Sequence, residues 1–153
     1  MKIVDMLKKE FIAVSLQAKD KADVLSELSS LFTYGNIKYD QAAMVKALLE
    51  REKLGTTGIG DGIAIPHGKL ADLDEMYVAF GKSDAGIPFE AMDGKPVHLF
   101  FLLVAPEQST GQHLKTLAKL SRMLKDVEFR KHLLGARTAD ELYRAIAEKD
   151  DAC

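Results

Sequence analysis

The chain has 153 residues, of which 47% are hydrophobic and 29% are charged, and its formal net charge at pH 7 is −2. This length and composition predict a single folded domain over residues 1–153 and exclude a disordered or membrane-embedded chain. Acidic and basic residues are interspersed without a basic stripe, so nucleic-acid binding is not expected, and the single cysteine, Cys153, leaves neither an internal disulfide nor a cysteine-based metal site.

Two amphipathic helices are predicted in the first third of the chain. Asp20 can cap a helix whose apolar positions recur at intervals of three and four and which ends before Gly35. Asp40 opens the second helix, which ends before Gly55 and carries Arg51 in its last turn. The positions expected to face inward on this second helix are Met44, Val45, Ala47, Leu48 and Leu49.

A glycine-rich segment follows, GTTGIGDG over residues 55–62, and its composition predicts an irregular binding or hinge loop without regular structure. Short apolar or alternating runs at residues 63–65, 76–80 and 97–104 predict strands, with residues 11–16 as a further candidate. The longest apolar run, residues 97–106, is too short to cross a membrane, and the N-terminus is too polar for a signal peptide. A cytoplasmic protein is therefore expected.

Three more helices are predicted in the last third of the chain. Residues 109–112 form a capping-box pattern that opens a helix with His113 in its first turn. A helix from Asp126 ends at Gly135, and a second capping box at residues 138–141 opens the terminal helix. Helices among strands predict a layered α/β domain. The core-facing positions expected on the first of these helices are Leu114, Leu117, Leu120, Met123 and Leu124.

The stretch GIAIPHGK, residues 62–69, places His67 between a proline and a glycine and poses the question of its chemistry. Asp61 and Gly62 occupy the places where a nucleotide-binding P-loop needs Lys and Ser or Thr, and Ile63 occupies the place of the third glycine of a dinucleotide fingerprint. The four histidines have no metal-ligand spacing, and no GxSxG serine motif occurs. No metal and no cofactor are therefore expected.

The remaining chemistry for His67 is phosphoryl acceptance. A neutral imidazole is nucleophilic and titrates near neutral pH, so it can take a phosphoryl group as a labile phosphoramidate and release it again. Such a transfer requires positioning and positive charge, which glycine-rich backbone, Arg51 and helix N-termini can provide. A structural role remains open for each residue, because Arg51 could only complement the dipole of its helix and His113 could only belong to a capping region.

The same residues resemble a known active-site signature. Glu52, Ile59-Gly60 and the run from Ile63 to Gly68 are similar, without gaps, to the signature of fructose/mannitol-type IIA domains of the bacterial phosphotransferase system. The longer run from Arg51 to Lys69 most resembles the nitrogen-regulatory branch of that family, as do PFEAMDG at residues 88–94 and Glu141-Leu-Tyr143. The resemblance implies a single-domain three-layer α/β/α sandwich with a central mixed sheet.

The resemblance also implies roles for individual residues. His67 accepts phosphate on Nε2 from the histidine of an HPr-like carrier, while His113 and Arg51 match the second histidine and the arginine of the family's active site. A helix N-terminus disfavours a charged imidazolium at His113 and favours an anion beside it. Further residues are expected to support the phosphate through the loop, namely Glu52, Thr56, Thr57, Gly58, Gly60 and Gly68.

Three functions are compatible with this pattern. The first is a regulatory phosphocarrier that controls nitrogen- or potassium-related partner proteins through its phosphorylation state. The second is a sugar-specific IIA enzyme that passes phosphate to a IIB domain during uptake, and the third is a binding module in which His67 is never phosphorylated. A carrier docking on His67 needs an apolar patch, for which the expected exposed residues are Ile59, Leu70 and Met92.

Overall fold

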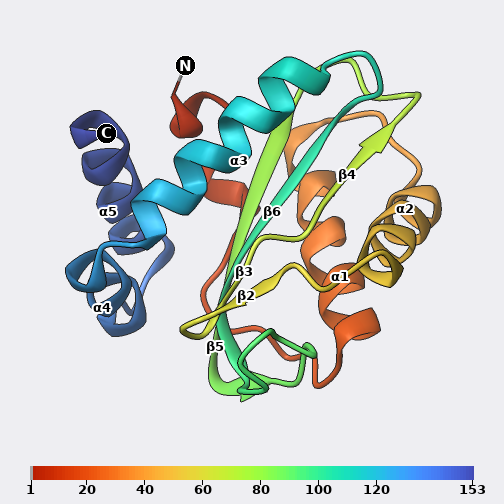
Figure 1. Cartoon of the computed structure of the whole chain (residues 1–153). Helices are drawn as coiled ribbons and strands as arrows, with labels where there is room; N and C mark the ends of the chain where they lie inside the picture. Colours follow the sequence, from red (N-terminus) through yellow and green to blue (C-terminus); the bar gives the residue numbers. More distant parts are fainter. Residues whose placement is uncertain (1) are drawn as a thin grey trace.

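A computed structural model of the chain describes residues 2–153, and within them a six-stranded mixed β-sheet lies between two groups of helices (Figure 1). The long strands β5 (Tyr77–Ile87) and β6 (Val97–Pro106) form its antiparallel centre. β1 (Ile12–Ala13) runs parallel to β5, β3 (Ile63–Ala64) and β4 (His67–Leu70) both run parallel to β6, and β2 (Gly58–Gly60) pairs antiparallel with β3. The sheet confirms the mixed α/β architecture.

Strand β6 is the buried centre of the molecule. Every residue from Leu99 to Ala105 is at most 1% exposed, so this strand is covered on both faces and needs apolar side chains at consecutive positions. The apolar run of the sequence therefore predicts the strand correctly. The predicted run at residues 76–80 is only the start of β5, which continues through a polar stretch to Ile87.

Helices α1 (Lys21–Ser30) and α2 (Gln41–Lys53) lie on one side of the sheet, and α3 (Thr110–Leu124), α4 (Val127–Gly135) and α5 (Ala139–Ala152) lie on the other (Figure 1). Short 3₁₀ turns occupy Ile3–Asp5, Lys9–Phe11 and Leu31–Gly35. The first predicted helix therefore ends in 3₁₀ geometry, and residues 11–16 contribute only the two-residue β1. Among residues 2–153, no helix combines the length and the apolar character that crossing a bilayer requires.

Predicted caps at two helix starts near the site are confirmed. The Asp20 carboxylate accepts a hydrogen bond from Asp23 N (2.8 Å), and the Asp40 carboxylate accepts one from Ala43 N (3.1 Å). Each carboxylate satisfies an amide that has no partner within the helix. The start of α2 is thereby defined, and the 13 residues of this helix place Arg51 in its last turn, as predicted.

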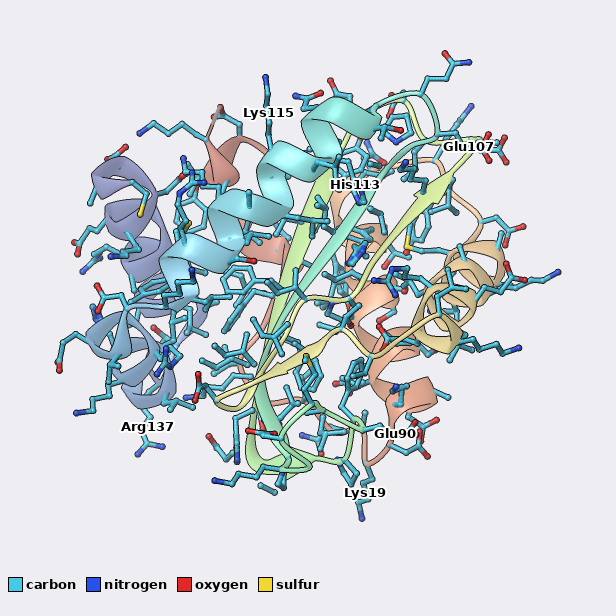
Figure 2. The ribbon with its side chains drawn as sticks, in the orientation of Figure 1. Lys19, Glu90, Glu107, His113, Lys115 and Arg137 are labelled. Carbon is cyan, nitrogen blue, oxygen red and sulfur yellow. The ribbon has the colours of Figure 1, made fainter. Side chains whose placement is uncertain are left out.

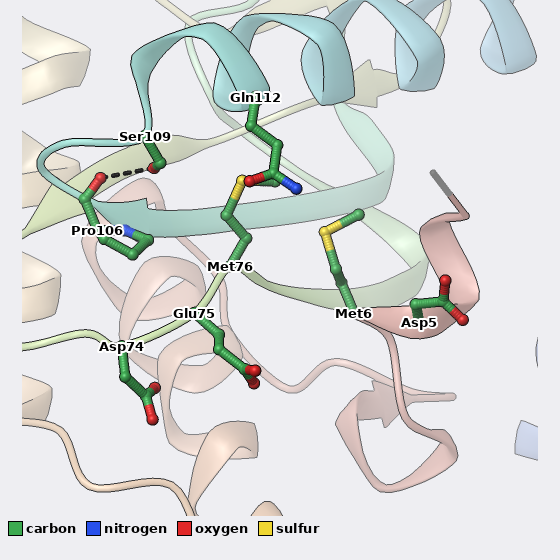
Figure 3. Close-up of a pocket in the computed structure, with 8 residues that line it drawn as sticks. All are labelled: Asp5, Met6, Asp74, Glu75, Met76, Pro106, Ser109 and Gln112. Carbon is green, nitrogen blue, oxygen red and sulfur yellow. Dashed lines mark hydrogen bonds between the residues drawn. The ribbon is translucent and has the colours of Figure 1, made fainter.

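The predicted capping box at the start of α3 is wrong. The Ser109 hydroxyl donates to the carbonyl of Pro106 (2.7 Å) and makes no bond to an amide of the first turn (Figure 3). The side chain closes the turn that leaves β6, because a hydroxyl next to a bent backbone can bond locally. His113 still lies in the first turn, but Leu114, expected in the core, is 59% exposed.

The glycine-rich segment contains the short strand β2, so its prediction as wholly irregular is wrong. A Cβ atom at Gly58 would lie 2.9 Å from Ala91 Cα, which means that only glycine permits this close approach of two backbones. The glycines here allow tight packing and turns, and the segment is an ordered edge beside β3.

Candidate functional site

Three elements bring Arg51, His67 and His113 to one cleft. Arg51 comes from the end of α2, His67 from the start of β4 and His113 from the first turn of α3. The cleft has a volume of about 650 Å³, and all three side chains line it. The residues that complete its lining are Ala47, Glu50, Leu54, Gly68, Lys69, Leu114 and Leu117.

Pro66 determines where His67 lies along the sheet. β3 and β4 are two segments that pair with the same edge of β6, with Ile63 opposite Leu99 and His67 opposite Leu103. Between them, the carbonyl of Pro66 accepts a hydrogen bond from Leu103 N (2.9 Å). Proline fixes φ and lacks an amide hydrogen, so it suits this break in the ladder. His67 is therefore the first residue of β4 and lies beyond the predicted strand at residues 63–65.

The hydrogen bonds of His67 define its tautomer. Nδ1 lies 2.9 Å from the carbonyl oxygen of Ile65, which can only accept, and Nε2 lies 3.2 Å from Arg51 Nε, which can only donate. Both contacts require the ring proton on Nδ1 and a lone pair on Nε2. The unprotonated nitrogen, Nε2, is thus the nucleophilic atom of the ring.

The surroundings of His67 keep it neutral. Burial lowers the pKa of His67 below its ordinary value, and the positive charges of Arg51 and Lys69 act in the same direction. The hydrogen bond to Ile65 and the charge of Glu52 oppose this shift only in part. A neutral ring at pH 7 keeps the lone pair on Nε2 available.

His113 lies against His67 from the opposite side of the cleft. The centroids of the two rings are 5.4 Å apart, and Figure 2 shows His113 on the side of α3 that faces the sheet, while Lys115 projects away from the protein. His113 is 5% exposed, and its buried Nε2 has no hydrogen-bond partner. Burial is the main cause that lowers the pKa of His113 to about 4, followed by electrostatic interaction with the His67 ring and by the positive charge of Lys69.

This shift predicts a pH-dependent stability. Between pH 4 and pH 6.5 the unfolded chain binds a proton at His113 that the folded protein excludes, so the free energy of unfolding falls as pH decreases through this window. The His113 contribution amounts to up to about 3 kcal/mol. Urea unfolding of the wild type and of His113→Gln from pH 7 to pH 4 measures it, and parallel pH profiles for the two proteins would contradict the prediction.

Lys69 and two exposed leucines complete the mouth of the cleft. Lys69 Nζ donates to the hydroxyl of Thr110 (2.7 Å) at the start of α3. Leu54 is 85% exposed and Leu114 is 59% exposed, and both line the cleft. Of the apolar patch expected from the sequence, Ile59 and Met92 are exposed as predicted, but Leu70 is buried on β4, where it points into the core.

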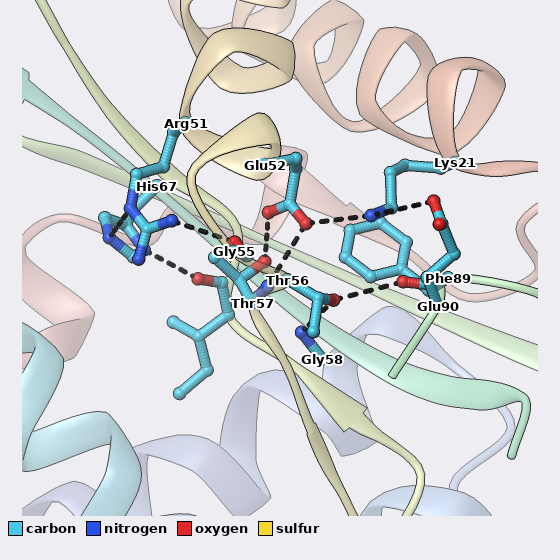
Figure 4. A network of polar contacts seen from close by, with 11 residues as sticks. Lys21, Arg51, Glu52, Gly55, Thr56, Thr57, Gly58, His67, Phe89 and Glu90 are labelled. Carbon is cyan, nitrogen blue, oxygen red and sulfur yellow. Dashed lines mark hydrogen bonds and ion pairs between the residues drawn. The ribbon is translucent and has the colours of Figure 1, made fainter. Parts of the chain in front are cut away.

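The loop residues expected around the phosphate have other partners. The Glu52 carboxylate is buried and accepts hydrogen bonds from Thr57 N (3.1 Å) and from the Thr57 hydroxyl (Figure 4). The hydroxyl of Thr56 donates to Phe89 O (3.2 Å). Among the glycines, Gly58 and Gly60 form the ends of β2, and Gly68 alone lines the cleft.

The other candidate sites do not share the features of this cleft. His98 bonds through Nδ1 to the carbonyl of Ser83 (2.9 Å), and His132 is exposed on α4. A separate hollow of about 410 Å³ is lined by the carboxylates of Asp5, Asp74 and Glu75, which disfavour an anion (Figure 3). Over residues 2–153, no three or more His, Cys, Asp or Glu side chains form a group that could hold a metal ion.

Sequence reasoning missed Lys69, Leu54 and Leu114 as parts of the cleft. A signal for Lys69 was present, because residues two apart on a strand share a face and Lys69 follows His67 by two. Leu54 and Leu114 are apolar neighbours of Arg51 and His113 at helix ends, and their exposure depends on how α2 and α3 pack. That packing has no local signature in the sequence.

Comparison with known proteins points to one family. The family model described as "Phosphoenolpyruvate-dependent sugar phosphotransferase system, EIIA 2" matches residues 5–149. A nitrogen regulatory protein of Bradyrhizobium diazoefficiens is 42% identical over 147 residues, which span 96% of this chain and 95% of the relative. The fructose-specific EIIABC component of Bacillus subtilis is 38% identical over 150 residues, which span 98% of this chain and 24% of that protein.

A solved structure extends the comparison to the fold. The nitrogen regulatory protein IIA-Ntr from Neisseria meningitidis superimposes with a TM-score of 0.88 at 33% sequence identity, over 94% of this chain and 98% of that one. The likeness therefore covers the sheet, both groups of helices and the elements that carry the cleft.

Proposed function

Because the chain belongs to the EIIA 2 family of the phosphoenolpyruvate-dependent sugar phosphotransferase system, we propose that it is a phosphohistidine carrier modified on Nε2 of His67. The donor is the phosphohistidine of an HPr-like carrier protein. The phosphorylation state of His67 then regulates nitrogen- or potassium-related partner proteins in the cytoplasm.

The observation that carries this proposal is the state of the His67 ring. Its proton is directed to the Ile65 carbonyl, and its lone pair is on the nitrogen that lies beside Arg51 in the cleft. In the transfer step, this lone pair forms a bond to phosphorus while the bond between phosphorus and the donor's imidazole nitrogen breaks. The electron pair of the broken bond returns to the donor ring, so the step needs no further reactant.

Arg51 and His113 are placed to receive the transferred group. The Arg51 guanidinium, which donates to Nε2 in the unmodified protein, can donate to a phosphoryl oxygen once the lone pair is used. Nε2 of His113 is buried without a partner, and with a proton on that nitrogen it can donate a second hydrogen bond to the group. We infer that Arg51 offsets the phosphate charge and that His113 orients it.

The degree of likeness supports the regulatory function over sugar transport. A relative named a nitrogen regulatory protein is 42% identical over 96% of this chain, and the solved IIA-Ntr structure superimposes with a TM-score of 0.88 at 33% identity. The alternative is a sugar-specific IIA enzyme that passes its phosphate to a IIB domain. Both functions use the same acceptor atom, so they differ in the protein that binds next.

The mouth of the cleft suits brief docking of a carrier. Leu54 and Leu114 offer exposed apolar contact on either side of the acceptor, and Arg51 and Lys69 supply positive charge. A phosphorylated donor carries negative charge at its own histidine, so attraction speeds encounter. A small interface of this kind also permits rapid release.

The test is phosphorylation with purified components. The protein is incubated with phosphoenolpyruvate, enzyme I and an HPr-like carrier, and its intact mass is measured before and after brief acid treatment. We expect one acid-labile phosphoryl group. Absence of labelling would support the binding-module hypothesis instead, and rapid transfer onward to a purified IIB domain would favour the sugar-specific alternative.

A further inference from the structure

A second set of contacts begins at Lys21, outside the cleft, and leads to the His67 ring. Lys21 Nζ lies 3.2 Å from the Glu52 carboxylate, which in turn binds both the amide and the hydroxyl of Thr57 (Figure 4). The side chain of Glu52 is 3% exposed and that of Lys21 is 17% exposed. A buried carboxylate is stable only when it is paired and hydrogen-bonded, and these three contacts satisfy it.

The contacts continue from Thr57 to the His67 ring through one residue, Ile65. Ile65 N donates to the carbonyl of Thr57 (3.1 Å), and Ile65 O accepts the hydrogen bond from Nδ1 of His67 (2.9 Å). The hydrogen bond to Thr57 therefore positions Ile65, and the Ile65 carbonyl in turn orients the His67 ring. We name Lys21, Glu52 and Thr57 together the Lys21 relay.

We propose that the Lys21 relay consists of positioning residues that keep the proton of neutral His67 on Nδ1, so that Nε2 is the phosphoryl acceptor. Neither Glu52 nor Thr57 lines the cleft, so they act through the Ile65 carbonyl and do not touch the phosphate. If the Thr57 segment shifts, the Ile65 carbonyl shifts with it and the bond that defines the tautomer weakens. The ring proton can then move to Nε2, which blocks the acceptor atom.

Lys21 also fixes the relay to a second segment of the chain. Its ammonium group lies 3.4 Å from the Glu90 carboxylate and 4.8 Å from the centroid of the Phe89 ring. Phe89 is 1% exposed, so its ring is fixed in the core and can position the ammonium group of Lys21. Lys21 is the first residue of α1. The relay therefore connects α1 with the end of α2 and, through Ile65, with the start of β4 at His67.

The test reads the tautomer directly. In protein labelled with nitrogen-15, the ring nitrogens of His67 are observed by NMR at pH 8, where the imidazole is neutral, and a protonated nitrogen is distinguished from an unprotonated one by its chemical shift. The wild type is expected to carry the proton on Nδ1. Thr57→Val and Lys21→Met are expected to change the ratio of the tautomers by roughly two- to tenfold, the equivalent of one hydrogen bond.

Conservative variants and a neighbouring control define what the result means. Thr57→Ser and Lys21→Arg keep the hydroxyl and the cation and should restore the wild-type ratio. Thr56→Val removes a hydroxyl from the adjacent residue, which donates to Phe89 O and accepts from Gly58 N and not from a member of the relay, and should leave the ratio unchanged. A ratio that stays at the wild-type value in Thr57→Val and Lys21→Met would overturn the proposal, as would an equal change in Thr56→Val.

The catalytic consequence of the relay rests on the proposed function, but the tautomer does not. The rate of phosphorylation by the HPr-like carrier is expected to fall in Thr57→Val by the same factor as the population of the Nδ1-protonated ring. If the wild type took up no phosphate, the proposed function would fail while the NMR ratios still decided the relay. Should Lys21→Met fail to fold, Thr57→Val carries the test alone, because it preserves the hydrogen bond from the backbone amide of residue 57 to the Glu52 carboxylate.

Discussion

His67→Ala is expected to abolish phosphorylation by an HPr-like carrier. Alanine removes the Nε2 lone pair, and the second histidine of the cleft, His113, is only 5% exposed, so its ring is inaccessible to a donor. Intact mass after incubation with phosphoenolpyruvate, enzyme I and the carrier measures the loss. No phosphoryl group should be detected on the variant under conditions that label the wild type fully.

Two histidine variants serve as matched controls for this result. His132→Ala removes an exposed imidazole on α4, away from the cleft, and should be labelled as the wild type is. His113→Ala should still accept phosphate on His67, but its phosphorylated form should hydrolyse sooner or pass the group on more slowly. Full labelling of His67→Ala, or equal loss of labelling in His132→Ala, would refute His67 as the acceptor.

The sequence predicts most of the framework of this site because the relevant signals are local. Asp20 and Asp40 are capping residues followed by apolar positions at helical spacing, and both helices begin where these signals place them. The sequence likewise predicts that Arg51 lies in the last turn of a helix and His113 in the first turn of another. The structure brings these three residues to one cleft.

The parts that local reasoning missed depend on contacts between distant segments. Gly58 belongs to a strand that pairs with β3, and its backbone lies against Ala91, a neighbour 33 residues away in the chain. Ser109 follows the capping-box pattern but bonds to Pro106, since the chain leaving β6 brings that carbonyl closer. Lys21 has no motif at all, and only the fold places its ammonium group beside Glu52.

Arg51→Met is expected to slow phosphoryl transfer to His67 by roughly 10²- to 10³-fold, the usual cost of losing one donor aimed at developing negative charge. Methionine has a similar length and supports the helix equally well, but it carries neither the charge nor the Nε donor. The pKa of His67 should rise, because the positive charge of Arg51 lowers it in the wild type. Rapid-quench labelling and an NMR titration of the ring measure these two effects.

A purely structural role for Arg51 predicts a different result from a catalytic role. Substitution of neighbouring Lys53 distinguishes the two. Both residues lie in the last turn of α2, where positive charge stabilises the helix, but only Arg51 reaches His67 Nε2 and the Gly55 carbonyl. If Arg51 served the helix dipole alone, Lys53→Met and Arg51→Met would lose similar stability and both would transfer phosphate at the wild-type rate. Arg51→Lys restores the charge without the Nε donor, so we expect a rate between those of Arg51→Met and the wild type, since charge and directed hydrogen bonding both stabilise the phosphoryl group.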